Sequence, residues 1–200
     1  MRHKPVGSLS RSLGIGITPK GAKVLDERPS RPGQHGRDRH TLTEYGTRLR
    51  EKQRLRAQYH ITERQLQRAF PEAARKPGRT GDNLIADLER RLDTVVLRAG
   101  FARSIYQARQ LVSHGHVLVD GVRLNLPAYR VQDGEIVSIK PASTLMPVFV
   151  AAREGAHVDS TPPYLEVNRE LLAARVLREA VRAESPVVCD MQLVVEYYAR

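Results

Sequence analysis

The residues whose types could do chemistry gather around His114-Gly115-His116, in the stretch ARQLVSHGHVLVDG of residues 108–121. Two imidazoles could hold a metal ion, act as general bases or contact a polyanion. A zinc site needs three or four ligands in tetrahedral reach, and no cysteine pair, H-x-x-x-H pattern or carboxylate cluster completes a set. A histidine base needs a nucleophile or an orienting acid, and the sequence shows no nucleophile motif, P-loop or carboxylate pair. We therefore expect no metal, no cofactor and no catalytic residue.

Two interpretations of these histidines stay open. They could be polar rim residues at the end of a helix, or they could contact nucleic acid. A glycine between them would let another backbone approach closely. The basic and amide side chains expected nearby are Arg123 on the following hairpin and, on the outer face of the preceding helix, Arg103, Arg109 and Gln110.

Net charge is the strongest property of the whole chain. It is +11 over 200 residues, with 24 Lys and Arg against 11 Asp and Glu in residues 1–110 but 9 against 11 in residues 111–200. A positive field of this size favours a nucleic acid partner. A membrane-surface protein would need a basic amphipathic helix with a large apolar face, and none is found. With one cysteine, Cys189, and no apolar segment typical of a signal peptide or membrane span, we expect a cytoplasmic protein.

A second basic group lies on a predicted helix over 42–59, which Thr43 can cap. Its cations form two stripes, the first of Arg48, Lys52 and Arg56 and the second of Arg50 and Arg54. A merely solvated helix tends to alternate signs, so stripes of one sign indicate a face for RNA. Replacing the first three with alanine should leave the free protein no less stable, because alanine keeps helix propensity and like-charge repulsion disappears.

Further helices are expected over 61–76, over 83–100 with Asn83 as cap and Gly100 as stop, and from the Ser104-x-x-Gln107 capping box to Gly115. The period then changes to two. Asp120-Gly121 predicts a hairpin that pairs Val119 with Val122 and Val117 with Leu124, and these four side chains should share one buried face. A second turn at Asp133-Gly134 should pair 129–132 with 135–140. Residues 143–163 resemble a loop, 168–181 a helix, and 190–200 either a helix or a strand.

These elements predict an α+β fold, in which a helical domain accompanies a small module of helices packed on a short antiparallel sheet. The expected parts are an irregular basic arm over 1–41, a helical domain over 42–89 joined by the tail 185–200, the module over 90–152, and an extension over 153–184 packed on the module.

The stretch RLDTVVLRAGFARSIYQARQLVSHGHVLVDG resembles the RNA-binding module named after bacterial small-subunit ribosomal protein four. RPGQHGR followed by EYGTRLREKQRLRAQY, and the ending LVVEYYAR, resemble the rest of that family. The chain departs from the family in three ways. It has no N-terminal cysteine cluster, Asp120 stands where Asn is usual, and Tyr106 stands where Arg is frequent.

The resemblance implies a primary binder of 16S rRNA that docks on a junction in the five-prime domain, nucleates assembly of the subunit body and influences translational accuracy. It implies neighbours in ribosomal proteins three, five and twelve, and a place where mRNA enters the small subunit. The residues expected to bind RNA are Arg31, Arg37, Arg48, Arg50, Lys52, Arg54, Arg56, Arg103, Arg109, Gln110, His114, Gly115, His116 and Arg123.

Two rivals share the module. An RNA-modifying enzyme would need a catalytic domain, for which residues 141–200 are too few. A free-standing ribosome-rescue or heat-shock RNA binder would not need residues 1–60.

Overall fold

A computed structural model describes residues 5–38, 41–157 and 161–199. The chain forms two compact units, one made of residues up to Glu72 together with Val187 onward, the other of Ala73–Pro186. The expected boundary at 89/90 thus lies inside the second unit. Arg39 and His40 of the expected arm, residues 158–160 of the expected loop, and Arg200 of the tail lie outside the described residues.

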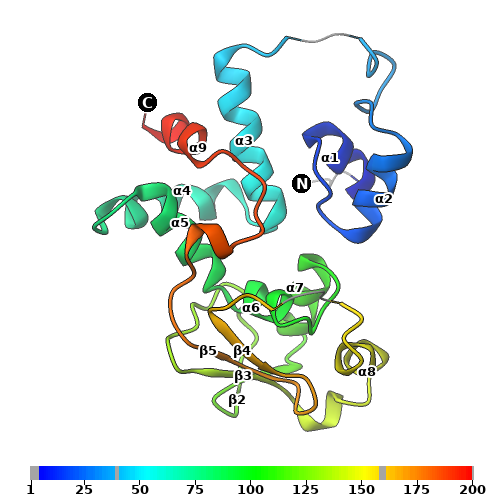
Figure 1. Cartoon of the computed structure of the whole chain (residues 1–200), viewed down its shortest axis with the longest axis vertical. Helices are drawn as coiled ribbons and strands as arrows, with labels where there is room; N and C mark the ends of the chain where they lie inside the picture. The colour runs from blue at the N-terminus through cyan, green and yellow to red at the C-terminus, as the bar shows by residue number, and fades with distance from the viewer. Residues whose placement is uncertain (1–4, 39–40, 158–160, 200) are drawn as a thin grey trace. The chain divides into compact units, whose positions relative to one another are not determined.

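The first unit is helical (Figure 1). Its helices are α1 (Val6–Leu13), α2 (Pro19–Glu27), α3 (Glu44–Gln58), α4 (Glu63–Arg75, whose last residues pass the boundary) and α9 (Met191–Tyr198). Helix α1 packs on α2, and α9 packs along α3 although more than 130 residues separate them in sequence.

The irregular arm expected over 1–41 is wrong for residues 6–27, which form α1 and α2. Thr18 caps α2 by accepting a hydrogen bond from the Gly21 backbone N–H at 3.0 Å. A Cβ on Gly21 would overlap the hydroxyl of Ser10, so this glycine lets the two helices touch. Described residues 28–38 are irregular, as expected.

The limits of α3 and α9 follow from their caps. The side chain of Thr43 accepts from the Gly46 backbone N–H at 3.1 Å, which confirms the predicted start of α3. Asp190 caps α9 by accepting from Gln192 and Leu193. The choice left open for the tail is therefore resolved as a helix.

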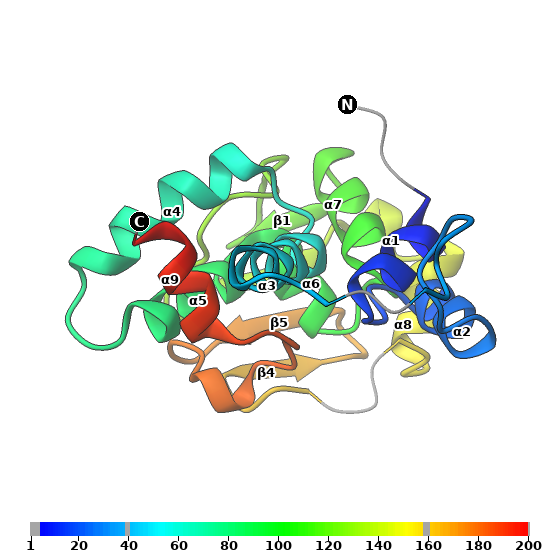
Figure 2. The same ribbon diagram turned by 90° about the horizontal axis from the view of Figure 1, so that it is seen from above.

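The second unit is a sheet with helices (Figure 2). Its helices are α5 (Thr80–Glu89), α6 (Leu92–Arg98), α7 (Ile105–Ser113) and α8 (Pro147–Arg153), with 3-10 turns at Pro141–Ser143 and Arg182–Glu184. Its antiparallel strands are β1 (Val117–Val119), β2 (Val122–Arg123), β3 (Ile136–Ile139), β4 (Leu165–Asn168) and β5 (Ala173–Val176), in the order β2-β1-β3-β5-β4. One core joins α6 and α7 to the inner face of the sheet, and the α+β prediction is confirmed.

The helix expected over 83–100 is broken into α5 and α6, because Arg91 is extended and bridges Arg130. Asn83 is not a cap but lies in the first turn of α5. Its side-chain amide donates to the carbonyls of Ala73, Lys76 and Pro77, and thus stabilises the end of α4. Gly100, at a φ of 76°, follows the end of α6 as predicted.

The hairpin prediction is confirmed in its turn and register. Val119 pairs with Val122, and Asp120 and Gly121 adopt φ values of 47° and 79°. The prediction of a common buried face is wrong for Val122, which is 68% exposed because β2 is an edge strand. Leu124 is half-buried.

Three other predictions are wrong. Residues 129–132 do not form a strand with 135–140, since β3 pairs with β1 and β5 instead. The expected loop 143–163 contains α8. The helix expected over 168–181 is the hairpin of β4 and β5, where pairing with β3 overrides local helix propensity.

Candidate nucleic-acid interface

The predicted RNA-binding residues of the second unit lie around helix α7 and the turn that follows it. The Ser104 side chain caps α7 by accepting from Gln107 N–H at 3.3 Å. The Gln107 side chain accepts from Arg103 N–H at 3.0 Å, so the predicted capping box closes one residue earlier than its usual form. The helix stops at Ser113, and Gly115 takes the left-handed conformation at a φ of 73°.

Arg123 lies over the backbone of Gly115. Its Nη2 donates to the carbonyl oxygen of His114 at 3.4 Å, and a Cβ on Gly115 would overlap the guanidinium. Gly115 therefore serves two purposes, since it ends α7 and leaves room for an exposed cation. The close approach that the sequence suggested at this glycine is made by a side chain of the hairpin.

The two histidines have different surroundings. His114 is exposed, whereas His116 is half-buried with Nδ1 at 2.9 Å from Ser143 Oγ. Burial, and then the charges of His114, Arg123 and Lys140, lower the pKa of His116. His116 is thus neutral near pH 7, and its ring is held in place by Ser143. The sequence interpretation missed Lys140, which directly follows β3 and donates its backbone N–H to the His116 carbonyl oxygen at 2.9 Å.

The outer face of α7 is only partly available. Arg103 and Gln110 are exposed, as predicted. Arg109 Nη1 lies 3.8 Å from the buried carboxylate of Asp93, and 30% of its side chain is exposed. Arg109 therefore faces a buried acid while part of its side chain stays exposed.

Most of the α3 cations form ion pairs with acidic side chains of the first unit. Arg48 pairs with Glu196 of α9 at 2.8 Å, and both Lys52 and Arg56 pair with Glu63 of α4 at 3.0 Å. Lys52 is only 3% exposed and also lies 4.2 Å from the ring centroid of Tyr197. Arg48, Lys52 and Arg56 share one face of α3, as predicted, but acidic side chains of α4 and α9 pair with that face.

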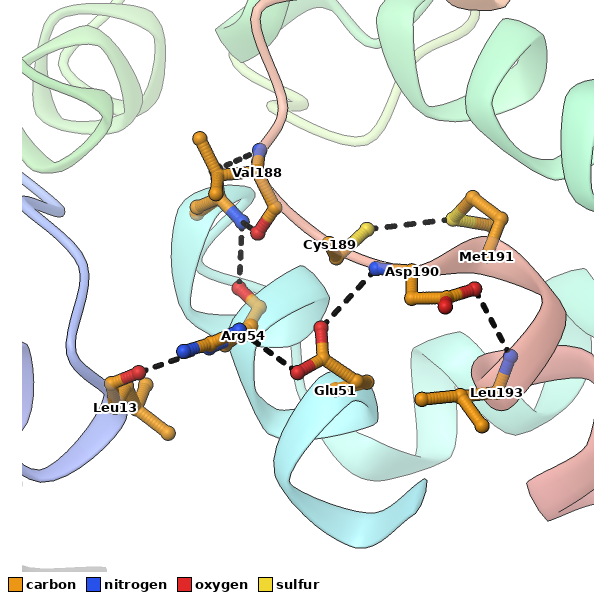
Figure 3. Close-up of polar contacts among 9 residues, drawn as sticks. Leu13, Glu51, Arg54, Val188, Cys189, Asp190, Met191 and Leu193 are labelled. Carbon is orange, nitrogen blue, oxygen red and sulfur yellow. Dashed lines mark hydrogen bonds and ion pairs between the residues drawn. The ribbon is translucent and has the colours of Figure 1, made fainter. Parts of the chain in front are cut away.

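Of the second α3 stripe, Arg54 is also tied to the fold. Figure 3 shows Arg54 donating to the carbonyl of Leu13 and to Glu51, each at 2.8 Å. Glu51 in turn accepts from the Asp190 backbone N–H at 3.1 Å. Arg50 is half-buried, and its Nε has no hydrogen-bond partner among the described residues. Arg54 is thus held by an acid three residues away on its own helix and by a backbone carbonyl 41 residues away.

The remaining predicted site residues lie in the irregular segment after α2. Arg31 is half-buried and its carbonyl accepts from Arg11 Nη2 at 3.2 Å, while Arg37 is exposed. In the part of the chain that the structure describes, no group of three or more His, Cys, Asp or Glu side chains could hold a metal ion. In the same part, no helix is long and apolar enough to cross a bilayer.

Exposed cations gathered around one helix of a small α/β module are typical of a protein that binds nucleic acid. Family models match the chain as the "Ribosomal protein S4/S9 N-terminal domain" over residues 2–89 and as the "S4 domain" over residues 90–137. The chain belongs to the ribosomal protein S4 family.

Full-length relatives agree with this assignment. The chain is 53% identical to the small ribosomal subunit protein uS4 of Paenarthrobacter aurescens and 57% identical to that of Pseudarthrobacter chlorophenolicus. It is 52% identical to the uS4 protein of Streptomyces avermitilis. Each comparison covers 100% of this chain and 98% of the relative.

Replacing Gly115 with alanine should weaken RNA binding more than it weakens the fold. The left-handed backbone costs an alanine about 1–2 kcal/mol, and the new Cβ displaces the flexible guanidinium of Arg123. RNA affinity should fall as far as in Arg123→Ala, and the double variant should bind no more weakly than either single one. Melting curves and rRNA-fragment titrations measure the two effects.

Gly134→Ala is the matched control. Gly134 has a φ of 89°, and a Cβ there would have nothing within 4 Å. This variant should show a similar loss of stability with unchanged RNA affinity. Additive losses in the Gly115/Arg123 double variant would show that the glycine does not act through Arg123.

Proposed function

We propose that this protein is the S4 constituent of the small ribosomal subunit in the cytoplasm, and that it binds 16S rRNA as a structural component rather than as an enzyme. The observation that carries the proposal is the match along the whole chain to proteins named small ribosomal subunit protein uS4. The exposed cations around α7 and the hairpin supply the chemistry, because phosphate oxygens are the strongest acceptors that RNA offers to arginine.

The finer proposal is that the protein binds rRNA early, at a junction in the five-prime domain, nucleates assembly of the subunit body and contributes to translational accuracy. Ribosomal proteins three, five and twelve are proposed as neighbours, and mRNA as a further partner where it enters the subunit. These assignments rest on membership of the family.

The proposed RNA contacts of the second unit are Arg103, Arg109, Gln110, His114, Gly115, His116 and Arg123, with Lys140 added. Arg31 and Arg37 are proposed as contacts of the irregular segment. Arg50 of α3 stays a proposed contact. The other α3 cations, Arg48, Lys52, Arg54 and Arg56, are not included, because acidic side chains pair with them. Recognition should depend on shape and phosphate, since aromatic residues make up only 5% of the chain and tryptophan is absent.

Sedimentation of a cell lysate tests the proposed function. The protein should migrate with small subunits, and it should stay there through a moderate salt wash. Migration at the top of the gradient, with free proteins, would contradict the proposal.

Affinity for a five-prime-domain rRNA fragment should fall steeply with salt. Each phosphate contact releases counterions and contributes roughly 0.7–0.9 to the slope of log affinity against log salt, so a slope of several units is expected. Filter binding at four or more salt concentrations measures it. A flat response would exclude recognition dominated by phosphate.

A further inference from the structure

Ser143 is a buried residue of the second unit that the proposed RNA contacts above do not include, and its hydroxyl holds the ring of His116. Lys140 follows β3 and bonds the His116 carbonyl oxygen through its backbone N–H at 2.9 Å. The 3-10 turn Pro141–Ser143 then folds back, because the Ser143 N–H donates to the Lys140 carbonyl oxygen at 2.8 Å. This turn places Ser143 Oγ 2.9 Å from Nδ1 of His116, which fixes the orientation of the imidazole.

The surroundings of the Ser143 hydroxyl decide which ring nitrogen of His116 carries the proton. Ser143 is 6% exposed, and among the described residues its hydroxyl has no partner other than His116. A buried hydroxyl proton needs an acceptor, and Nδ1 is the acceptor within reach. A neutral imidazole that accepts at Nδ1 carries its proton on Nε2. The Nε2–H group of His116 is therefore the donor that remains for a partner.

Nε2 of His116 faces solvent beside positive groups. Within the described part of the chain, Nε2 has no hydrogen-bond partner, and it is not buried. The charges of Arg123 and Lys140, both exposed, act on the ring, and the ring of His114 lies 6.2 Å away between centroids. Together with burial, these groups lower the pKa of His116 and keep it neutral near pH 7. The site thus offers one neutral donor of fixed direction next to two permanent cations.

We propose that Ser143 holds His116 so that Nε2–H donates to the 2′-hydroxyl oxygen of one rRNA ribose, which makes this site specific for RNA over DNA. The proposal rests on the rRNA-binding function above and deepens it. Phosphate oxygens bind most strongly to charged donors, and Arg123 and Lys140 supply these donors beside the ring. Each ribose lies between two phosphates, so a neutral donor beside cations that hold phosphates meets the sugar. The 2′-hydroxyl is the group by which a protein distinguishes RNA from DNA.

The test maps which riboses of the RNA need their 2′-hydroxyl. The full chain binds a five-prime-domain rRNA fragment in which each position carries a 2′-deoxynucleotide, with a cleavable tag, in a small fraction of the molecules. Bound and unbound RNA are separated and cleaved at the tags, which shows where a deoxy sugar weakens binding. Affinity for the unmodified fragment is also measured at several salt concentrations.

Four variants are compared with the wild type, and each is checked by its melting temperature. His116→Ala removes the donor, and His116→Phe removes it while keeping a ring, so that one variant still tests the contact if the other does not fold. Ser143→Ala removes the group that positions the ring. His114→Ala is the matched control, because it removes the neighbouring exposed histidine and leaves the Ser143–His116 pair intact.

Deoxy substitution should weaken wild-type binding at one nucleotide or more. At one of these nucleotides the effect should vanish in both His116 variants, shrink in Ser143→Ala and persist in His114→Ala. Affinity of the His116 variants for the unmodified fragment should fall about two- to ten-fold, the range for one hydrogen bond between neutral groups. Their salt slope should equal that of the wild type, because no charged contact is lost.

The possible results separate this proposal from the function on which it rests. If the wild type binds the fragment and the His116 variants keep every deoxy effect, the ribose contact is refuted and the proposed function stands. A smaller salt slope in the His116 variants would also refute it, since His116 would then act as a cation on phosphate. An undiminished effect in Ser143→Ala would refute the role of Ser143. If the wild type shows no binding to the fragment, the contact and the proposed function are both refuted.

Discussion

Replacing Glu89 with alanine is expected to lower the free energy of unfolding by about 3–5 kcal/mol, the cost of breaking a buried ion pair. The Glu89 side chain is completely buried at the end of α5. It accepts two hydrogen bonds from Arg98 at 2.9 and 3.0 Å, one from Tyr164 at 2.8 Å and one from Ser185 at 2.7 Å. Alanine leaves the four donor groups of these three residues without their acceptor, and the Arg98 guanidinium is charged.

The donors come from α6, from the segment before β4 and from the segment after the last 3-10 turn, so one carboxylate ties together distant parts of the second unit. Burial and the charge of Glu89 raise the pKa of Tyr164, which keeps its hydroxyl protonated as a donor. Urea unfolding at neutral pH measures the loss of stability. The control is Glu179→Ala, which removes an exposed partner of Arg90 and should change little. Equal small effects in both variants would show that Glu89 is not the centre of this network.

Replacing Lys52 with alanine is expected to lower the free energy of unfolding by about 2 kcal/mol at neutral pH, the range for a hydrogen bond to a charged group. Lys52 is buried between Glu63 and the ring of Tyr197. Burial alone would raise the pKa of Glu63, but hydrogen bonds from Lys52, Tyr198 and Arg56 hold that pKa below its ordinary value.

The dependence on pH identifies the cause. Because the pKa of Glu63 is lowered by folding, its contribution to stability is present above the unfolded pKa of about 4.3 and is lost as pH falls through the folded value. The stability difference between wild type and Lys52→Ala should therefore shrink below pH 4.3, whereas lost packing alone would give a constant difference. Arg68→Ala, which removes an exposed cation from α4, should leave stability unchanged at every pH. If Lys52→Ala is as stable as wild type, the pairing with Glu63 does not stabilise the fold, and the hypothesis of a free basic face on α3 is favoured again.

This expectation reverses the one drawn from the spacing of Arg48, Lys52 and Arg56. Helical periodicity correctly placed the three on one face and could not tell what faces them. Glu196 is 148 residues from Arg48, and Glu63 lies on the next helix. Arg64 and Arg68 of α4, which are absent from the predicted RNA-binding residues, are exposed cations of the first unit.

The sequence by itself determined the features that depend on a few neighbouring residues. Thr43 begins α3, Gly115 ends α7, and Asp120-Gly121 sets the hairpin register, because capping and tight turns are decided within about four residues. Net charge and the motifs around Gly115 also determined the class of partner and the family.

Only the tertiary structure decided which elements meet. Residues 168–181 contribute to a hairpin because β5 pairs with β3. Helices α1 and α2 pack closely because Gly21 has no side chain. Arg48 and Lys52 of α3 pair with acids on α9 and α4. Each outcome depends on partners far along the chain, brought together by packing of the whole core. Periodicity records which face a side chain occupies but not which group lies opposite it, so local rules could not distinguish a cation free for RNA from one already paired.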